Sequence, residues 1–366
     1  MNKSLSYLKP YISKIEPYQW EDSEDAVKQK YGLDRILHFD TNTAPTPPPC
    51  YDRWLEILKS DRKINEYKDF TYETLQALLA SYTEVPKEQV VVTASGDEGI
   101  DILSKATLGP GDRFVISSPT YSMYKIQGTL MGAEAIDVPL RAPDFTLDET
   151  ALIAATQTAK LLYICNPNNP IGTLQPRSTV ERIISSSPCL VVVDEAYFEF
   201  GGESVQDLVL RYDNLVILRT FSKFAALAGA RVGYLITNPT LADSLNAIRF
   251  PMGISYPSME IARLVLTEDR EWIRSNVSMI KLEREQMQNA LTALGLQVYP
   301  SSTNFLLVRL GEQAERIVQA LKEQGLLVRN YAANRFVPLC VRITIRSPEE
   351  NAILLQSLKG ILNGTR

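Results

Sequence analysis

The sequence predicts an α/β protein, with a mainly parallel central sheet sandwiched by helices and a smaller α+β unit after it. Between residues 89 and 236, short apolar runs such as 161–165 and 190–193 alternate with segments long enough to form a helix. Runs that are apolar throughout are typical of strands buried on both faces, as in a parallel sheet covered by helices. After Arg249 the pattern changes to a long helical stretch followed by short strands, which favours a second unit.

The expected elements follow in chain order. Strands of the large sheet are expected at residues 89–93, 113–117, 135–138, 161–165, 190–193, 215–218 and 232–236. A helix is expected at 97–108, and a glycine- and proline-containing turn at 109–112. In the second unit we expect helices at 268–294, at 314–323 and from 348 onward, and strands at 296–299, 304–309, 326–329 and 341–345.

Three parts are predicted along the chain. Residues 1–40, which include Pro10, Tyr18 and Trp20, should form an N-terminal arm or lid that packs with the small domain. Residues 41–248 should form the large α/β domain, and residues 249–366 the small α+β domain. The prolines after Asn42 fix an extended backbone, which is also what a plain linker would contain.

Composition and charge narrow the classes of function. The chain has 366 residues, of which 45% are hydrophobic and 22% charged, with a formal net charge of −5. This composition is ordinary for a globular protein, and the charge offers no basic field for nucleic acid or an anionic membrane. The first residues lack the apolar core of a signal peptide, and no run is long enough for a membrane span. We therefore expect a cytoplasmic protein.

Cysteine and histidine usage argues against several kinds of catalysis. The four cysteines lie far apart and form no CxxC pair, so buried free thiols are expected rather than a zinc or redox centre. Cys165 precedes a candidate site segment but is not favoured as a nucleophile. His38 is the single histidine, which rules out a multi-histidine metal centre, and we expect it to be structural. The catalytic base should then be a lysine, a carboxylate or a tyrosine.

Lys223 carries the main functional signal. It ends the segment 220–223 after an apolar strand and lies eight residues before Arg231, while Asp194 and Tyr197 follow an earlier strand. Together these groups suit pyridoxal phosphate. They offer an amine nucleophile, a carboxylate for a pyridinium nitrogen, a phenol for a ring oxygen, and a hydroxyl with a guanidinium for a phosphate. Lys223 would form an imine with the pyridoxal phosphate aldehyde and later move a proton at the substrate α-carbon. Taken alone, Lys223 is also what a surface lysine looks like, and Asp194 a helix cap.

Other segments complete this cofactor site. Gly96 and Asp97 lie between a strand and a helix, where backbone N–H groups and Ser222 can hold a phosphate, although such a turn also simply begins a helix. Tyr121 can stack on the ring or belong to the core. Asn169 lies between two prolines that fix the backbone after a strand, which would aim its amide at the ring oxygen, with a plain turn as the alternative.

Two arginines are candidates for the substrate. Arg342 begins the segment 342–345 in the last strand and can form a forked pair with an α-carboxylate, while Arg329 can meet a distal anionic group. Surface salt bridges are the alternative for both.

These residues carry a family resemblance over almost the whole chain. The order Asn169, Asp194, Tyr197, Lys223, Arg231 resembles the fold type I, class I/II aminotransferases that depend on pyridoxal 5'-phosphate, and among them the histidinol-phosphate aminotransferases. The resemblance implies the fold type I transferase fold and an amino acid or amino-acid-derived amine as substrate. It implies that Lys223 is the Schiff-base lysine. It also implies that the cofactor is bound by Gly96, Asp97, Tyr121, Asn169, Asp194, Tyr197, Ser222 and Arg231. The substrate would be bound by Asn42, Arg329 and Arg342.

The resemblance also implies a homodimer. Tyr67 matches a tyrosine that the family sends to the neighbouring subunit's phosphate, so the two active sites would be shared. No metal, nucleic acid or membrane partner is expected.

The chain departs from the family mainly on the substrate side. The N-terminal segment has Thr43 and Ala44 where an Asn-Glu-Asn-Pro is usual, the turn after Asn169 carries Ile171, and Arg346 replaces a common glycine. These changes fit a remodelled pocket. Transamination is therefore favoured, and the alternative is elimination or cyclisation of a hydroxylated amino acid such as a hydroxyarginine. A binding protein without turnover is a third hypothesis, disfavoured because the lysine is kept and we expect no attached DNA-binding domain.

Overall fold

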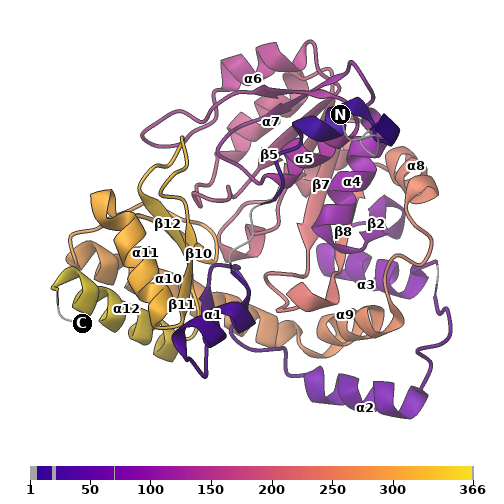
Figure 1. Ribbon diagram of the computed structural model, residues 1–366. Coiled ribbons are helices and arrows are strands. Elements are labelled where there is room, and N and C mark those ends of the chain that lie inside the picture. Colours follow the sequence, from indigo (N-terminus) through magenta and orange to yellow (C-terminus); the bar gives the residue numbers. More distant parts are fainter. Residues whose placement is uncertain (1–5, 19–21, 70, 365–366) are drawn as a thin grey trace.

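The computed structural model describes residues 6–18, 22–69 and 71–364, and contains two β-sheets surrounded by helices (Figure 1). The large sheet has the strand order β2-β8-β7-β6-β5-β3-β4, and only β8 runs antiparallel to its neighbours. The predicted α/β class with a mainly parallel sheet is therefore confirmed. Its strands are β2 (Val90–Thr93), β3 (Arg113–Ile116), β4 (Glu134–Asp137), β5 (Leu161–Cys165), β6 (Leu190–Asp194), β7 (Leu215–Thr220) and β8 (Gly233–Thr237).

Helices surround these sheets, and several begin at a residue whose side chain caps the helix N-terminus. Ser23, Asp148, Asn238, Ser255 and Ser347 each accept a hydrogen bond from a backbone N–H of the first helical turn. The helices are α1 (Glu24–Tyr31), α2 (Tyr51–Asp61), α3 (Glu73–Thr83), α4 (Ser95–Thr107), α5 (Met123–Leu130), α6 (Glu149–Thr156), α7 (Arg177–Ser186), α8 (Pro239–Ile248), α9 (Tyr256–Glu268), α10 (Arg270–Ala293), α11 (Ala314–Glu323) and α12 (Pro348–Leu362). None of them within the described ranges combines the length and the apolar character needed to span a membrane.

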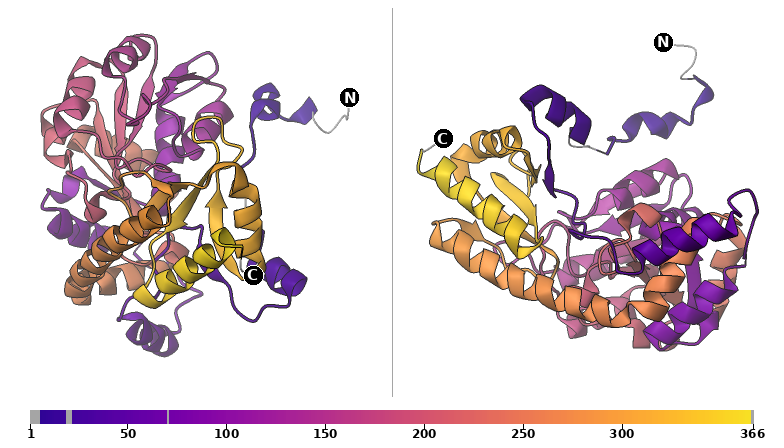
Figure 2. Two further views of the ribbon diagram at one scale, coloured as in Figure 1. Left: turned by 90° about the vertical axis from the view of Figure 1, so that its left-hand side faces the viewer. Right: turned by 90° about the horizontal axis from the view of Figure 1, so that it is seen from below.

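The small sheet has the strand order β1-β11-β12-β10-β9. It is built from β9 (Gln297–Val298), β10 (Phe305–Arg309), β11 (Leu326–Asn330) and β12 (Cys340–Thr344), and its edge strand β1 (Leu37–Phe39) comes from near the N-terminus. β1 pairs in parallel with β11, so the end of the predicted arm is part of this sheet. The helix α10 runs from beside the large sheet to the small one (Figure 2).

The rest of the predicted arm lies elsewhere. The short 3-10 helix Pro10–Lys14 packs on α5 of the large sheet, where the Tyr11 ring covers Gly132. The helix α1 packs instead on α11 beside the small sheet. Residues 10–18 and 22–39 thus touch both parts of the molecule. Trp20 and residues 1–5 lie outside the described residues.

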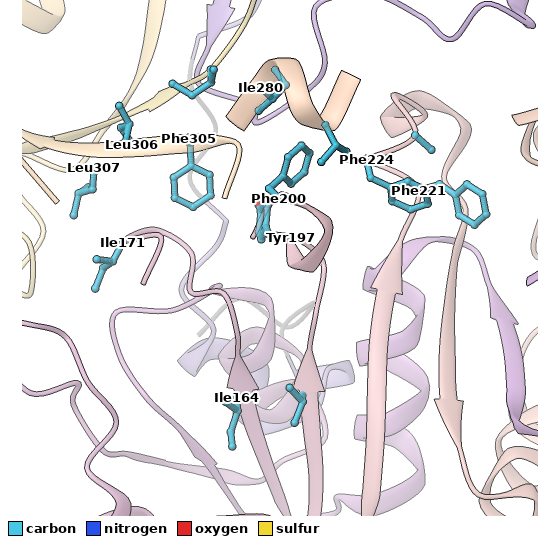
Figure 3. Packing of buried hydrophobic residues seen from close by; sticks show 14 of the residues in the cluster. Ile164, Ile171, Tyr197, Phe200, Phe221, Phe224, Ile280, Phe305, Leu306 and Leu307 are labelled. Carbon is cyan, nitrogen blue, oxygen red and sulfur yellow. The ribbon is translucent and has the colours of Figure 1, made fainter. Parts of the chain in front are cut away.

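Buried aromatic and aliphatic side chains join the two sheets. Tyr197, after β6, meets Phe305 of β10 edge to face, with ring centroids 5.3 Å apart (Figure 3). Phe200, Phe221 and Phe224 belong to the same buried cluster, which also takes in Ile280 of α10. The candidate site at the strand ends therefore lies next to a tightly packed group of apolar side chains.

His38 and Arg346 both have structural contacts. His38 Nδ1 and Nε2 lie 3.1 Å from Asp40 and 3.3 Å from Glu24 of α1. Arg346 is only 8% exposed, and its guanidinium donates to Glu350 of α12 at 2.7 Å and to the His38 carbonyl at 3.0 Å. Arg346 was one of the changes that fit a remodelled pocket, and in the structure its charge links the backbone of β1 to α12.

Glu350 offers a matched test of this role, since it pairs with both Arg346 and the 70%-exposed Arg35. We expect Arg346→Ala to lower the free energy of unfolding by about 3 kcal/mol, because a buried carboxylate loses its inner partner. Arg35→Ala should lower it by less than about 1 kcal/mol, because an exposed ion pair contributes little. Urea unfolding followed by circular dichroism measures both, and equal losses would contradict the structural role of Arg346.

Candidate active site

The register of the large sheet brings the candidate residues to one edge. Cys165 of β5 lies opposite Asp194 of β6, which lies opposite Leu218 of β7. Thr220 at the end of β7 and Thr93 at the end of β2 flank Gly233, the first residue of β8. The segments that follow β2, β5, β6 and β7 therefore leave the sheet side by side, at the edge where open α/β sheets bind ligands.

Lys223 lies in the turn after β7, over the ring of Tyr197, with Nζ 5.9 Å from the ring centroid. Nζ also donates to the carbonyl of Thr41 at 3.2 Å. Burial, assisted by the positive charge of Arg342, lowers the pKa of Lys223 to about 7. A large fraction of this amine is therefore uncharged near neutral pH, as a nucleophile requires.

Asp194 ends β6 and is 5% exposed. Its Oδ2 accepts a hydrogen bond from the Tyr124 hydroxyl at 2.5 Å, and its Oδ1 accepts from the backbone N–H of Ala196 at 2.9 Å. Burial raises the pKa of Asp194 to about 6, against the lowering effect of Tyr124. A carboxylate fixed in this way can hold a positively charged ring nitrogen.

The predicted phosphate residues meet at the start of α4. Asp97 accepts from the Tyr121 hydroxyl at 2.8 Å and from Arg231 at 2.5 Å. Its carboxylate would repel a phosphate, so Asp97 can contribute only its backbone N–H and its hold on Tyr121 and Arg231. The backbone of β8 passes very close by, because a Cβ at Gly233 would lie 2.5 Å from the Ser95 carbonyl carbon. Glycine is needed there.

Two more predicted residues complete this cluster. Ser222 lies beside it, with Oγ 2.9 Å from the Thr220 hydroxyl. A Cβ at Gly96 would lie 3.1 Å from Leu218, so the start of α4 packs tightly on β7.

Residues predicted for the substrate side form a second cluster. Arg342 donates to Asn169 Oδ1 at 2.7 Å and to the Asp40 carbonyl at 2.5 Å. The Tyr197 hydroxyl accepts from Asn42 at 3.0 Å and lies 3.5 Å from the Asn169 amide nitrogen. Among the described residues, buried Arg342 Nε has no hydrogen-bond partner, which leaves a donor for an anionic group.

A cavity of about 490 Å³ opens beside Arg342, Asn169 and Tyr121. Arg329 lies directly opposite Arg342 in the β11–β12 pair and also lines the cavity, with its guanidinium 5.6 Å from the Tyr18 ring centroid. Thr43, Ala44, Ile171 and Arg346 do not line it. Its other walls are the N-terminal segment 14–18, residues 116, 118–122, 125, 126 and 129 with Asp137 and Pro170, and the loop residues Tyr331, Asn334, Arg335 and Phe336.

Tyr67 lies on the surface, in the connection between α2 and α3, and is 79% exposed. The pKa of Cys165 is raised by burial, which does not favour it as a nucleophile.

Sequence reasoning missed two groups that support the site. Tyr124 lies in the first turn of α5, three residues after Tyr121, and this short spacing from a predicted site residue was the available signal. Glu195 pairs with Arg219 in the sheet interior at 2.7 Å, and this buried pair ties the end of β6 to β7.

Comparison with known proteins agrees with the fold. The family described as Aminotransferase class I and II matches residues 36–358. The histidinol-phosphate aminotransferase of Roseiflexus castenholzii is 37% identical, over 97% of this chain and 98% of the relative. That of Ruminiclostridium cellulolyticum is 35% identical over 89% and 92%. The solved structure of the Sinorhizobium meliloti enzyme in complex with pyridoxal-5'-phosphate has a TM-score of 0.88 and 24% identity, with 98% of each chain covered, and supports the fold.

The fold and the strand-edge site thus define an enzyme of the fold type I transferase class that depends on pyridoxal 5'-phosphate. The chain belongs to the class I and II aminotransferase family. Transamination is supported over elimination or cyclisation. The donor set fits the cofactor: a partly uncharged lysine, a buried carboxylate, and an arginine at a helix start.

The pKa of Lys223 predicts how cofactor attachment depends on pH. Because the amine must be uncharged to attack, we expect the attached fraction to fall as the pH drops through about 7. Borohydride trapping followed by peptide mapping measures attachment at Lys223. The exposed Lys105, paired with Asp101, should remain unlabelled, and Lys223→Ala should abolish trapping. A midpoint near the ordinary lysine pKa of about 10.4 would contradict burial as the cause.

Proposed function

We propose that the strand-edge site holds pyridoxal 5'-phosphate, and that the enzyme uses it to transfer an amino group from an amino donor to a keto acceptor. The observation that carries the proposal is the position of Lys223 in the turn after β7, with Nζ 5.9 Å from the centroid of the Tyr197 ring that follows β6, and its pKa is lowered to about 7. Buried lysines with a lowered pKa are typical of covalent catalysis on carbonyl groups.

The site residues would each contact a different part of the cofactor. Asp194 would hold the ring nitrogen, Tyr197 and Asn169 the ring oxygen, and Tyr121 the ring face. The phosphate would be held by Gly96, Asp97, Ser222 and Arg231. When bound, the cofactor supplies a carbonyl for amino-group exchange and an electron-withdrawing ring that stabilises negative charge at the substrate α-carbon.

Lys223 would have a second task after the substrate amine has replaced it. Its free amine would lie next to the substrate α-carbon and carry the proton from that carbon. A pKa of about 7 suits this task, because the amine can both accept and release a proton near neutral pH.

The substrate would be an amino acid, or an amine derived from one, with an anionic group. Arg342 has a buried Nε with no partner among the described residues, which supports a role in binding a carboxylate or phosphate. Arg329, on the opposite strand, would meet the distal end, and Asn42 would help position Tyr197. The relatives named histidinol-phosphate aminotransferase support histidinol phosphate as the first substrate to test.

A single-turnover half-reaction tests the function. Mixing the loaded enzyme with glutamate should produce pyridoxamine phosphate and 2-oxoglutarate, because the amino group stays on the cofactor. The donor panel should also contain histidinol phosphate, aromatic amino acids and hydroxylated basic amino acids. Lys223→Ala serves as the control and should give neither product. If no donor in the panel yields the amine form, the aminotransferase proposal fails.

We further propose a homodimer in which Tyr67 reaches the partner's phosphate site. Its 79% exposure on a connecting loop supports this, since a tyrosine used within its own subunit would be expected to be buried. Ile64 on the same loop is 78% exposed, which also favours a surface that a partner subunit covers.

Four buried free cysteines support a reducing, cytoplasmic location. We keep the boundaries near residues 40 and 248 as proposed domain limits.

Mixed dimers test whether the sites are shared. Lys223→Ala and Tyr67→Ala should each have low activity at limiting cofactor. In a mixed dimer, one site then has both defects and the other has neither, so co-expression should restore activity above that of both parents. If Tyr67 acts within its own subunit, every site keeps one defect and activity is not restored. Size-exclusion chromatography confirms that the parents and the mixture have the same oligomeric state.

A further inference from the structure

We propose that Tyr124 is a positioning residue for Asp194: its hydroxyl keeps that carboxylate ionised and aimed for the pyridine nitrogen. The proposal rests on the proposed function. Its basis is the 2.5 Å hydrogen bond from the Tyr124 hydroxyl to Asp194 Oδ2. The other oxygen, Oδ1, accepts from the Ala196 N–H at 2.9 Å, so the carboxylate cannot rotate without losing a buried hydrogen bond.

Tyr124 is itself held in place by its neighbours. Its ring is fully buried and stacks on Tyr163 with centroids 4.6 Å apart and an interplanar angle of 5°. Tyr121 meets its edge at 5.8 Å and 85°. The Tyr163 hydroxyl lies 3.1 Å from the Ser104 hydroxyl and 3.3 Å from the Ile100 carbonyl, so the second ring of the stack is fixed as well. The phenol therefore points at Asp194 before any ligand arrives.

The electrostatics favour a donor at this point. The titratable groups around Asp194 come from several elements: Tyr124 of α5, Asp97 of α4, Cys165 and Tyr163 of β5, Glu195 and Tyr197 of its own segment, and Lys223 after β7. Burial and the negative charges of Asp97 and Glu195 raise the pKa of Asp194 to about 6, while the Tyr124 bond lowers it. Because the pKa of Tyr124 is raised well above its usual range, the phenol remains protonated and can donate.

The consequence has a definite sign. Without the phenol, the pKa of Asp194 should rise further, so more of it is protonated near neutral pH. A protonated carboxyl does not attract a positively charged ring nitrogen. The acid side of the cofactor-binding profile should therefore move to higher pH, while binding at high pH, where Asp194 is ionised in either case, should change little.

Pyridoxamine 5'-phosphate is the suitable probe, because it lacks the aldehyde and cannot attach to Lys223. Its dissociation constant is measured by fluorescence titration of the full chain from about pH 5 to about pH 9, a range that brackets the Asp194 pKa of about 6. Tyr124→Phe keeps the ring and removes the hydroxyl. Tyr163→Phe is the matched control, because it removes the hydroxyl of the stacked ring that does not contact Asp194.

We expect Tyr124→Phe to shift the acid limb up by about one unit, which weakens binding about twofold near pH 7 and about tenfold near pH 5, and to match wild type near pH 9. Tyr163→Phe should follow the wild-type profile. In an Asp194→Asn background, adding Tyr124→Phe should cost nothing further if the hydroxyl acts through the carboxylate. A loss that is equal at every pH, or no loss, would overturn the proposal while leaving the cofactor site intact. If the wild-type chain binds neither cofactor form, the proposed function fails, and this inference with it.

Discussion

The parallel register of β5, β6 and β7 is the constraint on which the rest of the site depends. Because Cys165, Asp194 and Leu218 lie opposite one another, three segments leave the sheet at the same height, and their polar side chains converge without any long loop. A slip of one residue in β6 would turn Asp194 to the other face of the sheet and bring Val193 in its place. Every residue of β5 and β7 is buried, so such a slip would also disrupt close packing on both faces of the sheet.

Burial at this edge moves two pKa values toward each other. It disfavours the charged form of any group, so it lowers the pKa of Lys223 to about 7 and raises that of Asp194 to about 6. An isolated lysine and aspartate would both be fully charged between these values, whereas here each titrates close to neutral pH. The same packing that gives the sheet its stability therefore prepares an amine that can attack and a carboxylate that depends on its hydrogen-bond donors.

Local sequence was sufficient where a segment's own pattern decides its structure. The strand 161–165 and the helix 314–323 have the expected bounds, and Asp194 and Lys223 lie, as expected, at or just after the ends of buried strands. The edge strand Leu37–Phe39 was not foreseen, because it forms only by pairing with β11, which is remote in sequence. The helix α9 was not predicted, because its hydrophobic residues show no clear helical periodicity. The long helix expected from residue 268 begins after it, at Arg270. Tyr124 was missed because its partner comes from another element.

The substrate end of the cavity is shaped by parts of the chain that no local pattern connects. Thr43 and Arg346, which set this sequence apart from its family, bond to Thr41 and to Glu350 instead of lining the cavity, so they give no reason to expect an altered substrate. Residues that line the cavity form two ion pairs: Lys125 with Glu16 at 3.5 Å, and Arg335 with Asp137 at 3.2 Å. Exposed pairs of this kind contribute about 1 kcal/mol or less, so an anionic group can take over either cation at little cost. The described contacts of Arg342 are with uncharged oxygens, so its positive charge stays available at the inner end. The cavity is therefore suited to a substrate that is anionic at one end or at both.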